Sequence, residues 1–234
     1  MAFSRGPTIV TSGLVLALDA ADKLSYPGSG TTWTDLSGNS NTGTLTNGPT
    51  FSANNQGSIV FDGVNDYASL SSTAGLTNNF TIDLWCLPTA THEIDSESTS
   101  GTTGLSGQRY IVEAEHQGSN GGAGISIGTN GVSVYEHGDT YLPALLVYST
   151  TISSASHIVV VYTSKQPTLY INSSNVRTGL TSPKTTVYLS TPNIGGFPYG
   201  YFKGNIYAVK FYNRSLSATE ILQNYNATKS RFGL

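Results

Sequence analysis

The 234-residue sequence predicts an all-β domain, and three observations support this fold class. Charged residues make up only 11% of the chain, against about 25% in an average soluble domain, which excludes charge-rich helical bundles and coiled coils. The chain contains 14 Tyr, 8 Phe and 2 Trp, enough apolar bulk for a core, so a disordered chain is excluded. Short runs rich in Thr, Val, Ile and Tyr recur at a spacing of roughly ten residues, as in sandwiches and barrels.

The expected strands follow one another along most of the chain. Residues 14–19 (LVLALD) form the first, and residues 58–61 (SIVF) lead into the turn pair Asp62-Gly63. Residues 79–87 alternate between apolar and other side chains, which predicts one buried face. Further strands are expected at 109–115, 124–127, 131–136, 157–163, 168–172 and 204–212, with a glycine-rich hairpin loop at 118–124 and a turn at 166–167.

One helix is expected, near the end of the chain. Ser217 and Glu220 have the spacing of a capping box, in which the serine hydroxyl accepts from the Glu220 amide and the Glu220 carboxylate accepts from the Ser217 amide. Ile221, Leu222 and Tyr225 then form an apolar stripe at helical spacing. Such a short helix closes the fold and is no catalytic element.

The charges exclude nucleic acid as a partner. The formal net charge is −3, and the 11 basic residues are scattered, whereas phosphate binding needs about six to ten contacts on one face. Residues 1–150 carry 3 basic and 13 acidic groups, and residues 151–234 carry 8 basic and 1 acidic group. A single sandwich in which the two halves neutralise each other is the simplest interpretation.

Compartment and redox signals are few. Cys86 is the single cysteine, so an internal disulfide is excluded, and its place in an apolar run predicts a buried thiol. The first residues make a poor signal peptide, and no apolar run of about 18 residues predicts membrane insertion. We therefore expect synthesis in a cytoplasm without membrane insertion.

Six segments in order carry a family resemblance, although none is specific alone. They are residues 13–22 (GLVLALDAAD), 25–51 (SYPGSGTTWTDLSGNSNTGTLTNGPTF), 59–67 (IVFDGVNDY), 80–88 (FTIDLWCLP), 157–172 (HIVVVYTSKQPTLYIN) and 204–226 (GNIYAVKFYNRSLSATEILQNYN). The chain resembles laminin-G-like, concanavalin-A-like lectin/glucanase domains. The resemblance implies a jelly-roll sandwich of two antiparallel sheets with one short C-terminal helix, as a single domain over residues 13–234 after an extension at 1–12.

The ending at residues 222–233 (LQNYNATKSRFG), together with an opening without a signal peptide, resembles versions of this domain carried by tailed-bacteriophage virion proteins. That resemblance implies a place on the phage particle, with other virion proteins and copies of itself as partners. The resulting hypothesis is a non-catalytic structural or adhesion domain that acts by protein–protein docking, with host surface polysaccharide as a further partner. A carbohydrate-binding lectin module is the alternative, because this fold hosts several functions.

An acidic motif is the candidate for catalysis. Retaining glycosidases on this sandwich use Glu-x-Asp-x-Glu on one strand, and Glu93, Asp95 and Glu97 have that spacing. Ser96 stands where the motif is normally apolar, and the flanks are Thr, Ser and Gly within 88–108, a stretch without apolar periodicity. A solvated acidic loop is therefore favoured over a glycoside hydrolase, and no catalytic residue is expected.

A calcium site is the candidate for a metal. Asp62, Asn65 and Asp66 offer hard oxygens within one tight turn, as calcium prefers. The alternative is an Asx turn in which these side chains bind their own backbone. The second interpretation is favoured, and no cofactor is expected.

The remaining candidates are histidines and tyrosines. His116 and His137 lie near acidic residues without metal-ligand spacing, so no zinc site is expected, and His157 is expected to pack in a core strand. Four tyrosines on expected loops can stack on sugars or contact neighbouring subunits: Tyr135, Tyr141, Tyr199 and Tyr201. The alternative is that Tyr simply suits β-strands.

Overall fold

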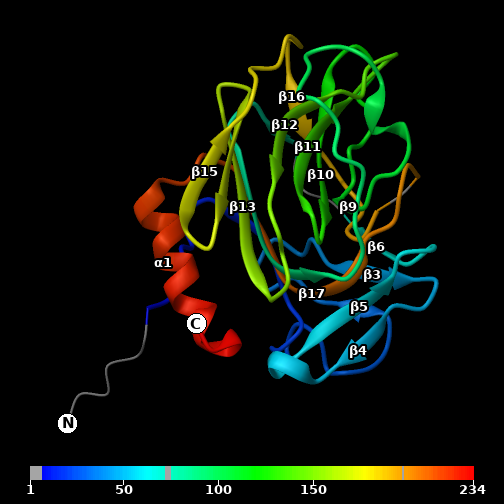
Figure 1. Cartoon of the computed structure of the whole chain (residues 1–234). Helices are drawn as coiled ribbons and strands as arrows, with labels where there is room; N and C mark the ends of the chain where they lie inside the picture. Colours follow the sequence, from blue (N-terminus) through cyan, green and yellow to red (C-terminus); the bar gives the residue numbers. More distant parts are fainter. Residues whose placement is uncertain (1–6, 72–74, 197) are drawn as a thin grey trace.

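The computed structural model describes residues 7–71, 75–196 and 198–234. Two β-sheets pack face to face, and a helix near the C-terminus lies against the outer face of the larger sheet (Figure 1). The larger sheet runs in the order β15-β14-β13-β8-β17-β5-β4, with β1 beside β17. The smaller sheet runs β12-β11-β10-β16-β7, with β9 beside β10, and β2, β3 and β6 form a third sheet. The predicted all-β jelly-roll sandwich is confirmed.

The described elements have the following bounds. The larger sheet contains β1 (Leu14–Asp19), β4 (Thr50–Ser52), β5 (Ser58–Asp62), β8 (Phe80–Pro88), β13 (Ser156–Thr163), β14 (Gln166–Ile171), β15 (Ser174–Thr178) and β17 (Lys203–Tyr212). The smaller sheet contains β7 (Leu76–Thr77), β9 (Tyr110–Val112), β10 (Gly121–Gly128), β11 (Gly131–His137), β12 (Ala144–Ser149) and β16 (Val187–Leu189). The third sheet contains β2 (Thr32–Trp33), β3 (Gly43–Thr46) and β6 (Tyr67–Leu70). The helix is α1 (Ala218–Thr228), and short 3-10 turns are η1 (Asn54–Gln56), η2 (Thr103–Leu105) and η3 (Lys229–Phe232).

Two local predictions were wrong. The β13–β14 turn lies at Ser164 and Lys165, both with positive φ, and Pro167 lies within β14. Proline had indicated a turn, but the positive φ values of the two preceding residues make the reversal. Residues 121–124, predicted as part of a hairpin loop, begin β10. Glycine is depleted in strands in general, yet here a chain segment crosses directly over the sheet and needs the space.

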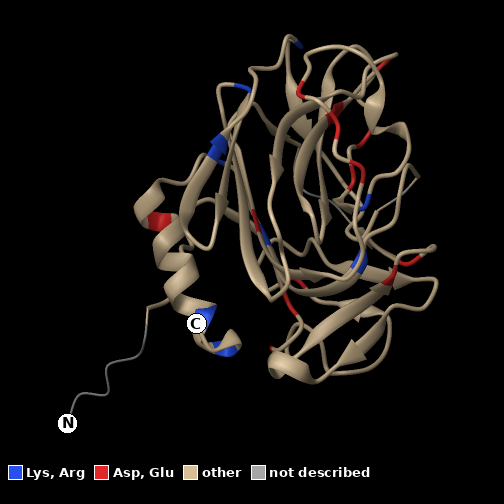
Figure 2. Cartoon of the chain, in the orientation of Figure 1, with Lys and Arg blue, Asp and Glu red and all other residues tan. Residues whose placement is uncertain are grey.

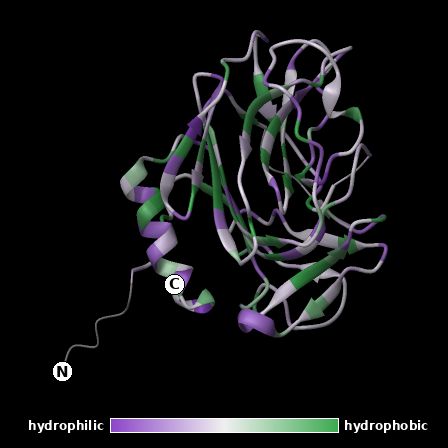
Figure 3. Cartoon of the chain, in the orientation of Figure 1, coloured by the Kyte–Doolittle hydropathy of each residue, from purple (hydrophilic) through white to green (hydrophobic). Residues whose placement is uncertain are grey.

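The core lies between the two large sheets. Phe80, Ile82, Leu84 and Cys86 of β8 all face it, as the alternation predicted, and all have no exposed surface. Burial raises the pKa of the Cys86 thiol to about 12, so the thiol is protonated and inert. Apolar residues concentrate on the sheet strands (Figure 3).

The opposite face of β8 is buried as well, because α1 covers it. Asp83 has no exposed surface and lies 3.1 Å from both Lys210 Nζ and His157 Nε2. Asn224 of α1 donates to the second Asp83 oxygen over 2.8 Å. Burial alone would raise the pKa of Asp83, but Lys210, His157 and Asn224 together hold it below its usual range. The helix is thus joined to the sheet by a buried hydrogen bond from Asn224 to the Asp83 carboxylate.

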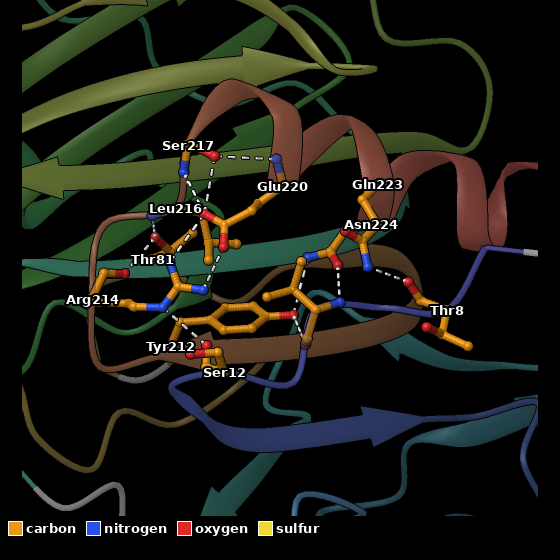
Figure 4. Close-up of polar contacts among 11 residues, drawn as sticks. Thr8, Ser12, Thr81, Tyr212, Arg214, Leu216, Ser217, Glu220, Gln223 and Asn224 are labelled. Atoms are coloured by element: carbon orange, nitrogen blue, oxygen red, sulfur yellow. Dashed lines mark hydrogen bonds and ion pairs between the residues drawn. The ribbon is translucent and has the colours of Figure 1, made fainter.

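Residues 7–12 run beside α1 and β17, and their backbone is held by side chains of both (Figure 4). Gln223 donates to the Thr8 carbonyl over 2.8 Å, and Tyr212 Oη donates to the Val10 carbonyl over 3.1 Å. The Val10 amide donates to Asn224 Oδ1 over 2.8 Å. The described part of the N-terminal extension is therefore packed on the domain.

The capping box predicted at the start of α1 is present in full. Among the described residues, no helix is long and apolar enough to cross a membrane.

Candidate functional site

The outer face of the smaller sheet is crossed by residues 113–117. A Cβ atom on Gly122 would lie 1.8 Å from the Glu115 carbonyl oxygen, and one on Gly124 would lie 2.3 Å from the Ala114 amide nitrogen. Real Cβ atoms do not approach backbone so closely, so these positions of β10 require glycine. The crossing segment brings His116 to the end of β11.

The loop of residues 89–109 covers the rest of this face. His92 Nδ1 lies 2.9 Å from Ser126 Oγ of β10, and burial lowers the pKa of His92 to about 4. The Gly104 amide donates to the Leu142 carbonyl over 2.9 Å. The loop is therefore bound to the sheet and closes one side of a cavity.

The acidic motif in this loop is spread over separate partners. Asp95 accepts from Tyr135 Oη over 2.6 Å, and Glu97 accepts from Arg177 Nε over 2.9 Å. Glu93 is exposed, and only Glu97 of the three pairs with a strand, through a single bridge to Ala144. The three carboxylates thus do not line one strand face as in the glycosidase motif. Asp95 and Glu97 bind the loop to neighbouring strands.

A cavity of about 240 Å³ lies at the end of β11, between this loop and the crossing segment. Its walls come from four stretches of chain far apart in the sequence. The lining residues are Thr102, Leu105, His116, His137, Gly138, Thr140, Tyr141, Leu142 and Tyr199. We call this cavity the histidine pocket.

Three rings stand in a row along one wall of the histidine pocket. The His116 and His137 ring centroids lie 4.8 Å apart at an interplanar angle of 78°. The His137 and Tyr199 centroids lie 5.1 Å apart at 83°. His116 Nε2 lies 3.0 Å from Asp139 Oδ1 at the surface, and His137 Nδ1 lies 2.9 Å from the Ala114 carbonyl. The wall therefore offers an aromatic ring and imidazole nitrogens side by side.

Tyr141, another lining residue of the pocket, is supported by a buried carboxyl group. Tyr141 Oη lies 3.4 Å from Glu136 Oε2, and Tyr162 Oη donates to Glu136 Oε1 over 3.2 Å. Ser182 also donates to Glu136. Burial raises the pKa of Glu136 to about 7 although these hydroxyl groups oppose the shift. Lys184 Nζ lies 4.2 Å from the centroid of the Tyr141 ring. Tyr141 therefore contacts Glu136 through its hydroxyl group and Lys184 through its ring.

The structure separates the four tyrosines that the sequence singled out. Tyr141 and Tyr199 line the histidine pocket. Tyr135 has no exposed surface and lies beneath the loop, so its side chain is closed to a ligand. Tyr201 is half-buried outside the pocket lining, and its carbonyl accepts from Arg109. The sequence did not predict that His116 and His137 form a site together. The sequence feature that they share is glycine close by, since residues 118–124 follow His116 and Gly138 follows His137.

The proposed calcium ligands interact with their own turn. Asp62 Oδ1 accepts from the Val64 amide over 2.7 Å and from the Asn65 amide over 3.3 Å. Asp66 Oδ2 accepts from the Asp62 amide over 3.0 Å. The Val64 bond is the main cause that lowers the pKa of Asp62, whereas burial raises that of Asp66. Within residues 7–71, 75–196 and 198–234, no three His, Cys, Asp or Glu side chains are grouped to hold a metal.

The profile of the Concanavalin A-like lectin/glucanases superfamily, in its laminin-G form, matches residues 62–222. The chain belongs to this superfamily. Its fold is therefore of the lectin type, which agrees with the resemblance drawn from the sequence. A search of curated proteins found no match to the chain.

Solved structures share the fold at low sequence identity. The binding domain of Paraclostridial Mosquitocidal Protein 1 has a TM-score of 0.66 and 17% identity, over 92% of this chain and 52% of that one. Domain 4 of AbnA, an arabinanase of Geobacillus stearothermophilus in complex with arabinotriose, has a TM-score of 0.64 and 14% identity, over 92% and 98%. Trypanosoma rangeli sialidase in complex with sialic acid has a TM-score of 0.62 and 16% identity, over 97% of this chain and 36% of that one. The chain thus spans about half of the toxin binding domain.

Proposed function

We propose that this domain is a non-catalytic carbohydrate-binding module whose binding site is the histidine pocket. The observation that carries the proposal is the ring row of Tyr199, His137 and His116 along one wall of the 240 Å³ cavity. An aromatic ring beside a few polar atoms is the usual composition of a sugar or small-ligand site. This volume lies just below the range of about 300–1,000 Å³ for drug-sized ligands, so the pocket suits one sugar unit.

The lack of catalysis is supported by the same cavity. Glycoside hydrolysis needs two carboxyl groups that face each other across the bond, about 5 to 9.5 Å apart. Among the described residues, none that lines the histidine pocket is an Asp or a Glu. The carboxylates of Asp95 and Glu97 bind Tyr135 and Arg177 instead. Two structural neighbours are complexes with arabinotriose and with sialic acid, which supports carbohydrate as the ligand class.

A glycan array, followed by calorimetry with the strongest binder, tests the proposal. Tyr199→Ala removes the stacking surface, and we expect the affinity to fall about two- to tenfold, because an aromatic contact of this kind contributes about 0.5–1.5 kcal/mol. Tyr201→Ala, outside the pocket lining, is the matched control and leaves the affinity unchanged. We also propose that no metal takes part, so binding persists in a chelator. Binding that weakens equally in both variants would place the site elsewhere.

The resemblance to phage proteins supplies the proposed setting. We place the module on the surface of a phage particle, docked to other virion proteins or to copies of itself, with host polysaccharide as its outer partner. Mass spectrometry of purified particles tests this placement. A protein found only outside particles contradicts it.

A further inference from the structure

The two histidines of the pocket have their neutral tautomers set by their partners. The Ala114 carbonyl can only accept, so Nδ1 of His137, 2.9 Å away, carries the hydrogen and Nε2 keeps a lone pair. The Asp139 carboxylate likewise assigns the hydrogen of His116 to Nε2. The Gly118 amide donates to Nδ1 of His116 over 3.4 Å, which agrees with this tautomer. Neutral His137, which lines the pocket, therefore has a hydrogen-bond acceptor at Nε2 to which a hydroxyl group can donate.

We propose that the histidine pocket is proton-gated: a ligand hydroxyl donates to Nε2 of His137 while both histidines are neutral, and acidification releases the ligand. This inference rests on the proposed function and names the chemistry and the regulation of the same site. The ligand class that follows is a neutral sugar, whose hydroxyl groups donate to neutral Nε2 or accept from protonated Nε2. Such a sugar brings no charge to compensate a protonated ring, so release depends on the cost of desolvating that charge.

The surroundings of His137 disfavour a charge on its ring. With ring centroids 4.8 Å apart, two imidazolium ions would repel each other. Burial is the main cause that lowers the pKa of His137, and the charge of His116 adds to it. The Ala114 carbonyl and Asp139 oppose the shift.

A bound sugar further disfavours the protonated form of His137. A neutral sugar that fills the pocket removes water from the His137 ring, and desolvation further disfavours the charged form. Linkage is reciprocal, so protonation must weaken the binding of that sugar by the same factor. The ionisable groups near the pocket are Asp139, which contacts His116, and Glu136 and Lys184, which both contact Tyr141. Asp139 favours protonated His137 and thus raises the pH at which half of the ligand is released.

The experiment measures the affinity for the strongest neutral oligosaccharide of the array from about pH 7.5 to about pH 5, the range in which histidine titrates. We expect the affinity of the natural chain to fall over this range, by at most about tenfold per pH unit below the midpoint for one proton. Asp139→Asn moves the midpoint to lower pH. His137→Asn keeps a donor for the Ala114 carbonyl, lacks Nε2, and binds weakly at every pH.

Two controls separate the gate from other acid effects. In Glu136→Gln the acid-dependent fall remains, because this carboxyl group supports Tyr141 and is not the proton acceptor of the gate. Side-chain NMR of the ligand-free protein should show the Nδ1–H tautomer for His137 and Nε2–H for His116. Equal affinity at both ends of the pH range, or the opposite tautomer of His137, overturns the gate while the proposed function stands. Absence of binding at every pH overturns both.

Discussion

At the scale of single residues, Asp83 shows how a buried charge is tolerated. Its carboxylate contacts Lys210, His157 and Asn224 from three different elements, without contact with solvent. The folded pKa lies below the unfolded value of 3.8, so its contribution to stability is present above that value and is lost as the pH falls toward the folded pKa. The network therefore adds stability at neutral pH.

We expect Asp83→Asn to lower the free energy of unfolding by about 3–5 kcal/mol, because Lys210 is left buried without its counter-charge. Urea unfolding at neutral pH measures the change. The double variant Asp83→Asn with Lys210→Met should recover part of this loss, since it removes the unpaired charge. A double variant as unstable as the single one contradicts the assignment of the cost to Lys210.

At the scale of elements, β10 depends on glycine because residues 113–117 cross it. We expect Gly124→Ala to destabilise the fold by about 1–3 kcal/mol, because the added Cβ would lie 2.3 Å from the Ala114 amide and the crossing segment must move. Gly43→Ala in β3 is the matched control. Its Cβ would meet side chains no closer than 3.6 Å, so its melting temperature should change little. Similar losses in both variants would show that the cost is one of backbone propensity alone.

Helix α1 begins at a capping box that also links it to Arg214, in the segment between β17 and the helix. Ser217 accepts from the Glu220 amide, and Glu220 also pairs with Arg214, as Figure 4 shows. The Arg214 hydrogen bonds are the main cause that lowers the pKa of Glu220 to about 2. The carboxylate therefore stays ionised over the whole physiological range.

We expect Ser217→Ala to lower the free energy of unfolding by about 1 kcal/mol, because one amide at the helix start loses its acceptor. Chemical denaturation measures the difference from Thr219→Ala, an exposed substitution in the same turn that should stay within about 0.5 kcal/mol of the natural chain. An equal effect of both substitutions would contradict a role for the cap.

At the scale of the whole molecule, the unequal charges of the two parts of the chain meet inside one fold (Figure 2). Six ion pairs are found among the described residues, counting those of histidine, and four join an acid before residue 150 to a base after it. They are His157–Asp83, Arg177–Glu97, Lys210–Asp83 and Arg231–Asp19. The strands are mixed in the same way, since β17 lies between β8 and β5.

We therefore expect fragments 1–150 and 151–234 to be unfolded alone and to fold when mixed. Circular dichroism follows the gain of β-structure, and added salt should slow the association, because long-range attraction between a fragment of charge −10 and one of +7 is screened. A fragment that folds alone would contradict the interdependence of the two parts.

Local patterns in the sequence determined much of this fold. Alternation along residues 79–87 identified the core face of β8, and the Ser217 and Glu220 spacing identified the start of α1. Both patterns act between residues close in the chain, where one or two hydrogen bonds or a strand's own pleat decide the outcome. The sequence also indicated Tyr141 and Tyr199 as candidate ligand-binding residues, and both line the histidine pocket.

Only the tertiary structure decided which of these residues meet. Gly122 pairs with His137 across β10 and β11, and the segment over Gly122 carries His116 to the same place. Buried Tyr135 became a partner of half-buried Asp95 because a loop without periodicity covers the sheet. The sequence alone determined a β-sandwich with a capped helix, because those signals are local. The histidine pocket depends on contacts between distant segments, and the chain settles these only when its sheets pack.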